Sequence, residues 1–294
     1  MEAHSPLTAE TSPDPQDSGE PPLSGERLLP LGRSLGMHGG VVWLREAWRV
    51  YRQAKLAAIA LALGALLLIL LAVAGPLTAA LALLACPFLL AASALVAQAD
   101  RRGAAPRWRV ISGALSQRAA SLSKLGLLGL ALSLALLMAV RLAEPLTHEE
   151  TLGHLIAEGL AGLVLLSAMI YSPFLMLEHG LSPTRALLAS AAGTWRNLLG
   201  AVELVIGFIF LCVVLCTPVV LVLVFASPDV TPRFATAISA LAAPSGNMRF
   251  AATVWLPVGA GLLLLPALVL SPYFAYRDIF IEEPPPAELS PLRL

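Results

Sequence analysis

The chain has 294 residues, of which 57% are hydrophobic and 13% are charged, and its mean hydropathy is +0.80. A soluble domain usually carries about a quarter of charged residues, so this composition excludes an ordinary charged surface and favours the lipid bilayer as solvent. The 19 basic and 19 acidic residues cancel to zero net charge, which argues against a nucleic-acid binder.

The first 40 residues are polar and rich in proline. A segment of this composition buries too little apolar surface to offset the entropy of ordering, so we predict a disordered cytoplasmic lead over 1–40. It does not resemble a secretory signal, because the first long apolar run begins only near Leu56.

Apolar residues then recur at three- and four-residue spacing from Val41 to Lys55, while Arg45, Arg49 and Arg52 fall on another face. This pattern predicts a basic amphipathic helix at the membrane surface. A plain positive flank to the first span would explain the same residues equally well.

Six apolar runs follow. No charged residue occurs from Leu56 to Ala99, a length that accommodates two spans of about 20 residues each, and Gly75-Pro76 is the natural turn between them. The third run is short, but the flanking Lys124 and Arg141 can snorkel to the interfaces. The predicted spans are about 56–74, 77–98, 125–143, 155–177, 198–225 and 252–276, within a membrane domain over 41–281, and 282–294 is predicted to be a disordered tail.

Lysine and arginine gather in alternate connections. They precede span one, occupy the connections between spans two and three and between spans four and five, and follow span six, whereas the opposite side carries only Arg141, Arg233 and Arg249. The positive-inside rule therefore predicts a multi-pass protein of the bacterial inner membrane with both termini in the cytoplasm.

Those cytoplasmic basic residues are expected to contact anionic lipid headgroups, where each contributes about 1 kcal/mol. The bilayer is the only partner that the sequence predicts, and nucleic acid is not one. The residues assigned to the headgroups are Arg45, Arg49, Arg52, Lys55, Arg101, Arg102, Arg107, Arg109, Lys124 and Arg196.

An internal repeat runs through the apolar segments. The stretch 162–174 ends in Ser172-Pro173-Phe174, the stretch 261–273 ends in Ser271-Pro272-Tyr273, and a weaker copy ends in Cys86-Pro87-Phe88. Amphipathic helices near 41–55, 107–123 and 183–197 precede the three pairs of spans. The predicted fold is therefore all-α and integral to the membrane: six transmembrane helices as three parallel-repeat hairpins, each preceded by a basic amphipathic interfacial helix.

Proline inside a membrane helix frees a carbonyl and kinks the helix, and a neighbouring serine hydroxyl can satisfy that carbonyl. The kinks either shape helix packing, which we favour, or surround a central cavity. Glu203 lies about one turn into the fifth span and either reaches the interface or pairs with Arg196, or else faces that cavity. The cavity or kink candidates are Pro87, Ser172, Pro173, Ser271, Pro272 and Glu203.

A weak metal-site candidate lies before the fourth span. Glu150, His154 and Glu158 are spaced by four residues, with His148 close by, and mixed His and carboxylate ligands can hold zinc. A polar helix start at the membrane surface explains these residues more simply. The three cysteines, Cys86, Cys212 and Cys216, lie in apolar runs and are interpreted as small hydrophobes. No cofactor is predicted.

Short motifs at three places carry a resemblance to known proteins: Trp43-Leu44-Arg45-Glu46-Ala47-Trp48, Leu181-Ser182-Pro183 with Trp195-Arg196-Asn197, and Tyr276-Arg277-Asp278-Ile279-Phe280. With them, the region 41–281 resembles an uncharacterised family of proteobacterial six-span inner-membrane proteins. It is more distantly similar to the membrane domain attached to some glycerophosphodiester phosphodiesterases. The resemblance implies an architecture and no catalytic residues.

The sequence thus predicts a polytopic inner-membrane protein that is not an enzyme and has a structural or envelope-homeostasis role. The alternative is a transporter or channel for a small or lipid-like solute, with a path lined by the Pro-kinked even-numbered helices. A metal-binding sensor is the third class, and it requires His154 and Glu158 to lie within ligand distance of each other.

Overall fold

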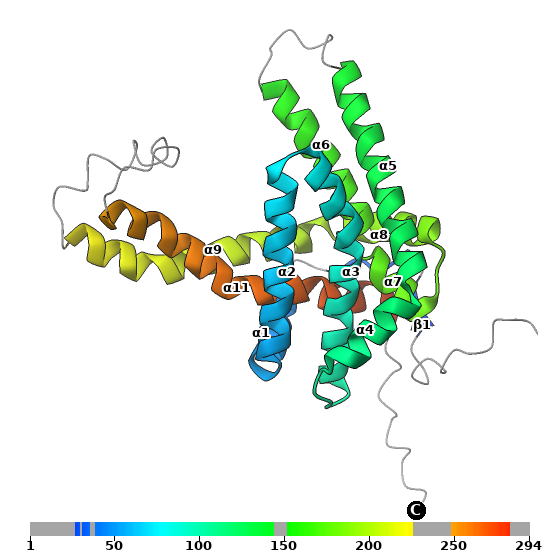
Figure 1. The fold of residues 1–294 in the computed structure, drawn as a ribbon, viewed down its shortest axis with the longest axis horizontal. Helices are drawn as coiled ribbons and strands as arrows, with labels where there is room; N and C mark the ends of the chain where they lie inside the picture. The colour runs from blue at the N-terminus through cyan, green and yellow to red at the C-terminus, as the bar shows by residue number, and fades with distance from the viewer. Residues whose placement is uncertain (1–26, 30, 36–38, 144–151, 226–247, 283–294) are drawn as a thin grey trace, which may run out of the picture.

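The computed structural model describes residues 27–29, 31–35, 39–143, 152–225 and 248–282, and these are almost entirely helical (Figure 1). Two very short strands accompany the helices. The elements in chain order are β1 (Arg27–Leu28), α1 (Gly39–Gln53), α2 (Lys55–Ala74), α3 (Pro76–Arg101), α4 (Trp108–Gln117), α5 (Ala119–Ala143), α6 (Leu152–Met169), α7 (Ser172–His179), α8 (Pro183–Arg196), α9 (Leu198–Phe225), α11 (Met248–Phe280) and β2 (Ile281–Glu282).

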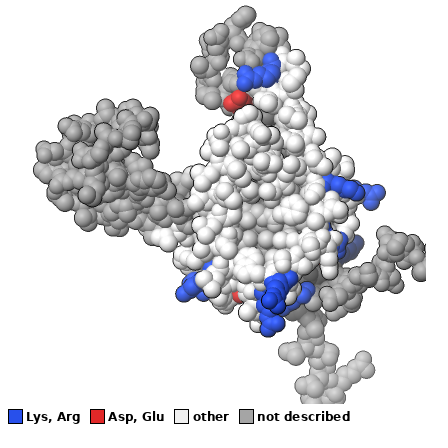
Figure 2. Space-filling model, in the orientation of Figure 1, with Lys and Arg blue, Asp and Glu red and all other residues white. Residues whose placement is uncertain are grey.

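Within the described residues, five helical stretches are long and apolar enough to cross a membrane: 55–74, 76–101, 119–142, 156–179 and 263–280. A sixth is obtained if α8 and the first part of α9, which meet at a bend of 74°, count as one span. Large apolar side chains such as Leu63, Val73 and Phe210 are more than half exposed, far more than a soluble surface tolerates. Figure 2 shows a broad uncharged surface through the middle, with lysine and arginine along the lower end of the view, on its right edge and at the top beside an acidic residue. These features confirm a helical chain built for a membrane.

The short helices predicted near 41–55, 107–123 and 183–197 correspond to α1, α4 and α8, although α4 stops at Gln117 and α5 begins at Ala119. Helix α1 does not simply lie on a surface. Trp43 and Val50 on its apolar face are fully buried, and this face packs against α9 and α11. A side chain at Gly40 would collide with the backbone of α9 at Gly200 and Leu204, so glycine permits this close approach.

The three consecutive pairs of long helices are not arranged alike. The pairs α2–α3 and α5–α6 stand roughly upright in Figure 1, whereas α9 and α11 run across them. The C-terminal part of α11 passes beside α2 and α3. The predicted hairpin partners do pack together, but they do not form three equivalent hairpins in one common direction.

Pro173 interrupts its span, as the sequence predicts for a kinked helix. Helix α6 ends at Met169 and α7 begins at Ser172, and the hydroxyl of Ser190 on α8 bridges the break. This hydroxyl accepts from the amide of Tyr171 (3.0 Å) and donates to the carbonyl of Ser167 (2.8 Å). These are the two groups that a continuous helix would join directly, so Ser190 substitutes for the lost backbone hydrogen bond.

Pro272 behaves differently, because α11 continues through it. A proline at 272 frees the carbonyl of Leu268, four residues earlier. The hydroxyl of Ser271 donates to that carbonyl at 2.8 Å. The carbonyl therefore keeps a hydrogen-bond donor, and the helix continues without a break. Pro87 also lies inside an unbroken helix, α3. The three prolines therefore share a sequence position but not a local geometry.

Part of the predicted disordered lead is ordered. Strand β1 pairs antiparallel with β2, and the amides of Leu29 and Arg33 donate to the carbonyls of Phe280 and Ile279 at 2.8 Å. We call residues 27–35 the N-terminal strap, of which residue 30 is not described. The sequence missed this strap because its pairing partner lies about 250 residues away at the end of α11, and composition carries no signal for a contact of that range.

The hydrophobic core lies at one end of the molecule. It is formed by α1, the first half of α2, the last half of α3, α7 and the end of α11. We call this the basic end, because Arg45, Arg52, Arg101 and Arg102 are exposed there. The described helices therefore meet in a packed platform at this end, whereas the far halves of α2 and α5 are largely exposed.

Candidate functional site

A carboxylate joins three of the predicted span ends. Glu178, near the end of α7, accepts hydrogen bonds from the amide of Gln98 on α3 (2.6 Å) and from the hydroxyls of Tyr273 (3.1 Å) and Tyr276 (2.9 Å) on α11. The second helices of all three predicted hairpins thus converge on one side chain. We call these four residues the Glu178 junction.

Aromatic rings fill the space beside this junction. The ring of Phe174 lies edge-on to that of Tyr273, with centroids 5.8 Å apart, and is tilted against that of Tyr276 at 5.4 Å. These contacts bring the aromatic residues of two Ser-Pro-aromatic motifs together. Phe174, Tyr273 and Tyr276 are completely buried, so the region between α7 and α11 is a packed core at this point.

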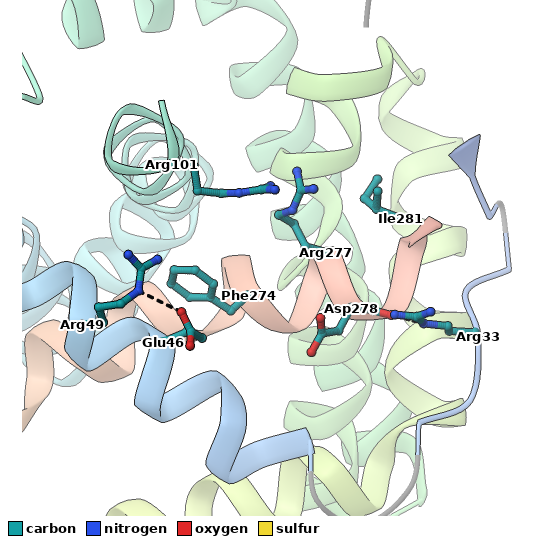
Figure 3. Close-up of a pocket in the computed structure, with 8 residues that line it drawn as sticks. All are labelled: Arg33, Glu46, Arg49, Arg101, Phe274, Arg277, Asp278 and Ile281. Carbon is teal, nitrogen blue, oxygen red and sulfur yellow. Dashed lines mark hydrogen bonds and ion pairs between the residues drawn. The ribbon is translucent and has the colours of Figure 1, made fainter. Parts of the chain in front are cut away.

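A pocket of about 330 Å³ opens at the basic end, next to the Glu178 junction. Figure 3 shows that its wall comes from four separate segments: the N-terminal strap, α1, the end of α3, and the last turns of α11 with β2. The lining residues are Arg33, Glu46, Arg49, Arg101, Phe274, Arg277, Asp278 and Ile281. We call it the arginine pocket.

Arginines dominate the polar part of this pocket. Arg49 pairs with Glu46 at 3.0 Å and lies 3.4 Å from Asp100, and Arg33 donates to the backbone carbonyl of Asp278. In Figure 3 the guanidinium groups of Arg101 and Arg277 point toward one another across the opening. Arg277 is only 9% exposed, so the fold holds it in the wall rather than in solvent.

Trp43 on α1 supports the wall of the pocket through Asp278. Its indole nitrogen donates to the Asp278 carboxylate at 2.8 Å, and only 1% of the residue is exposed. Asn197, between α8 and α9, accepts from the amide of Leu35 and donates to the carbonyl of Arg33. The strap and the end of α11 are therefore tied to both α1 and α8.

The cavity candidates from the sequence lie apart from the pocket. Ser172 and Ser271 are fully buried, and their hydroxyls donate to the backbone carbonyls of Ala168 and Leu268. Pro87 is buried in α3, and Pro173 and Pro272 lie beside their serines in α7 and α11. None of these five residues lines the arginine pocket.

Glu203 and Arg196 take separate partners among the described contacts. Glu203 accepts from the amide of Gly40 at 3.1 Å, near the start of α1, where unpaired amides favour a carboxylate. Arg196 donates to the carbonyls of Leu31 and Gly32 at 3.1 Å. The predicted choice between pairing and a cavity role for Glu203 therefore has a third outcome, which is a contact between α9 and α1.

The metal candidates lie mostly outside the described side chains. His148 and Glu150 fall in the gap 144–151, and the side chain of His154 is not described although its backbone belongs to α6. Glu158 is exposed on α6. Within the described parts of the chain, no three His, Cys, Asp or Glu side chains are grouped closely enough to hold a metal ion.

The predicted headgroup residues are mostly exposed, with Arg49 half-buried. Two of them, Arg49 and Arg101, line the arginine pocket. The sequence patterns did not single out Glu178 as a site residue, and Arg277 and Asp278 entered only as part of the Tyr276-Arg277-Asp278 motif. A usable signal was present, because acid and base adjoin at 100–101 and at 277–278, on two span ends predicted to lie on the same side of the membrane.

Comparisons with protein-family models, with curated proteins and with solved structures found no match to this chain.

Proposed function

We propose that this chain is a polytopic membrane protein of structural type, which holds anionic phospholipid headgroups at its basic end and provides no solute path between its helices. The observation that carries the proposal is the packed Glu178 junction. A path lined by the Pro-kinked helices would have to pass where Phe174, Tyr273 and Tyr276 are completely buried. Both serines that would line it instead satisfy backbone carbonyls.

The short helices support the placement of the basic end at a headgroup layer. Each of α1, α4 and α8 carries one tryptophan that is substantially exposed: Trp48 (37%), Trp108 (46%) and Trp195 (47%). Tryptophan is enriched where a membrane meets water, since its ring is apolar and its N–H is polar. Exposed arginines on or beside the same helices add attraction to an anionic leaflet.

The finer architecture belongs to the same proposal. The three units would each consist of one interfacial helix and one pair of spans, with both termini in the cytoplasm of a bacterial cell and the spans in its inner membrane. The alternation of basic connections supports this orientation. The resemblance to proteobacterial six-span inner-membrane proteins is part of the proposal and implies no enzymatic activity.

Cysteine accessibility tests whether the junction is closed. In a variant with Cys86, Cys212 and Cys216 replaced by alanine, we expect S172C and S271C to resist a small hydrophilic maleimide in permeabilised membranes. Both should react only after denaturation, because both positions are fully buried. Ser116, exposed on α4, is the matched control, and S116C should label completely. Labelling of S172C and S271C at a rate similar to S116C would favour the transporter or channel.

Reporter insertion tests the orientation. A reporter inserted after residue 105, between α3 and α4, should give the signal of a cytoplasmic location. The reason is that this connection carries Arg101, Arg102 and Arg107. An insertion after residue 146, on the side predicted to be external, is the matched control and should give the opposite signal. A periplasmic signal at 105 with a cytoplasmic signal at 146 would refute the proposed orientation.

A further inference from the structure

The arginine pocket is a built feature rather than a chance gathering of surface charge. Its four guanidinium groups come from the strap, α1, α3 and α11, so the complete fold is needed to bring them together. Hydrogen bonds fix the segments that carry them, through Trp43 to Asp278 and through Asn197 to the strap. A pocket assembled in this way has a defined shape before any ligand arrives.

The charge of the wall favours an anion. Four guanidinium groups face two carboxylates, Glu46 and Asp278, and each carboxylate already accepts a bond from the protein, from Arg49 and from Trp43. Two further acids lie behind the wall: Asp100 beside Arg49, and Glu178 at the tyrosine hydroxyls. The acids hold the scaffold, and the guanidinium groups of Arg101 and Arg277 lie at the opening (Figure 3). Arg101 is itself held in place by a hydrogen bond with the hydroxyl of Tyr273.

Guanidinium geometry narrows the class of anion. Its planar fork of N–H donors matches the oxygens of carboxylate and phosphate, with two parallel hydrogen bonds per pair. The forks of Arg101 and Arg277 lie close together (Figure 3), and two neighbouring forks suit a group with three or four oxygens better than a carboxylate with two. The volume of about 330 Å³ lies at the lower end of the range of roughly 300–1,000 Å³ for small-molecule sites, which leaves room for a phosphate and a few further atoms.

The position of the pocket relative to the apolar helices points to the same chemistry. Arg101 is the last residue of α3, where the apolar span ends, and Phe274 and Ile281 give the pocket an apolar side. A phosphate that entered here would lie at headgroup depth, with apolar surface next to it. The phosphate of a phospholipid meets both conditions, and a water-soluble phosphate ester meets the first.

We propose that the arginine pocket is a binding site for one phosphate group, contacted by Arg101 and Arg277 with Arg33 and Arg49 at its sides. The phospholipid source rests on the proposed function, because it requires the basic end to face an anionic leaflet. The phosphate chemistry itself rests only on the geometry of the pocket.

The test uses the full-length protein in nanodiscs and compares R101Q with R102Q. Arg101 and Arg102 are adjacent and both exposed, but only Arg101 lines the pocket, so the two variants remove the same charge from the same end of the protein. One arm titrates inorganic phosphate against protein in phosphatidylcholine nanodiscs. The other arm counts phosphatidylglycerol molecules retained from mixed nanodiscs by native mass spectrometry.

We expect R101Q to weaken binding in at least one arm by about tenfold, since it removes a charge-assisted contact, and R102Q to stay within about twofold of wild type. An effect in the phosphate arm identifies a soluble phosphate as a sufficient ligand, and an effect confined to the phosphatidylglycerol arm identifies the lipid. The melting temperature of each variant without ligand shows whether it is folded. R33Q serves as the second variant if R101Q is not.

Equal binding by wild type, R101Q and R102Q in both arms would overturn the pocket assignment, as would an absence of binding to wild type. This failure is distinguishable from failure of the proposed function. Reversed reporters at 105 and 146, or rapid labelling of S172C, would refute the proposed function and leave phosphate binding by the pocket intact. Suppose that the reporters at 105 and 146 give the expected signals and that S172C and S271C resist labelling. Equal binding by wild type, R101Q and R102Q would then refute the phosphate site alone.

Discussion

Replacing Glu178 with alanine is expected to lower the free energy of unfolding by about 3 kcal/mol. The change removes the acceptor for three donors, those of Gln98, Tyr273 and Tyr276. An unsatisfied buried donor costs about 1–3 kcal/mol in soluble proteins, whereas polar contacts between membrane helices average about 0.6 kcal/mol. The junction lies at the end of the spans between these two environments, so about 1 kcal/mol per donor is the appropriate scale.

The measurement is unfolding in mixed micelles with increasing denaturing detergent, and the matched control is E282A. Glu282 is exposed on β2, so its loss should change stability by less than about 0.5 kcal/mol. The conservative variant E178Q keeps an acceptor and should lose roughly half as much as E178A. A double-mutant cycle of E178A with Y276F isolates one contact. Additive losses in that cycle, or equal stability of E178A and E282A, would contradict the role of Glu178 as the joint between helices.

Replacing Trp43 with alanine is expected to have the largest effect of a single side chain, about 4 kcal/mol, within the usual range for a buried aromatic residue. Trp43 is only 1% exposed. Its ring packs against Gly200 on α9, so closely that a Cβ atom at residue 200 would lie 3.0 Å from the ring. Its N–H donates to Asp278. The variant therefore leaves a cavity between α1 and α9 and also removes one hydrogen-bond donor from the Asp278 carboxylate in the pocket wall.

Trp48 on the same helix provides the control. It is 37% exposed and stacks at a tilt on Tyr51, so W48A should lose less than about 1 kcal/mol. The variant W43F helps to separate the two contributions, since it keeps most of the ring volume and removes the donor to Asp278. Its loss should be about 1–2 kcal/mol. Similar losses for W43A and W48A in the same micelle titration would show that α1 is a peripheral helix, as the sequence pattern alone implies.

Much of the helical plan follows from local sequence. The predicted span 198–225 coincides with α9, and the spans predicted at 56–74 and 77–98 differ from α2 and α3 by at most three residues at either end. These limits are readable because charge, Gly-Pro and helix-end signals mark them within a few residues.

The candidate site was harder to predict, because its contacts join residues that are far apart in the chain. Nothing near Glu178 signals Tyr276, and nothing near Trp43 signals Asp278, which lies 235 residues away. The difference between Pro173 and Pro272 is also decided by partners. Ser190 comes from another helix and bridges a break, whereas Ser271 is the neighbour of its own proline and repairs the helix in place. Periodicity and hydropathy describe each helix alone and carry no information on such partners.

The pairing of the strap with the end of α11 has a consequence for how the protein is made. Arg33 can form its contact only after Asp278, 245 residues later, has been added to the chain. Ribosomes add roughly 5–20 residues per second. The strap therefore stays unpaired with α11 for about 12–50 s after it emerges, while the intervening helices are synthesised. Closure of the strap can occur only after the end of α11 has been synthesised. A molecule truncated before Asp278 would keep its first spans and lack the arginine pocket, so the pocket is present only in molecules that contain α11.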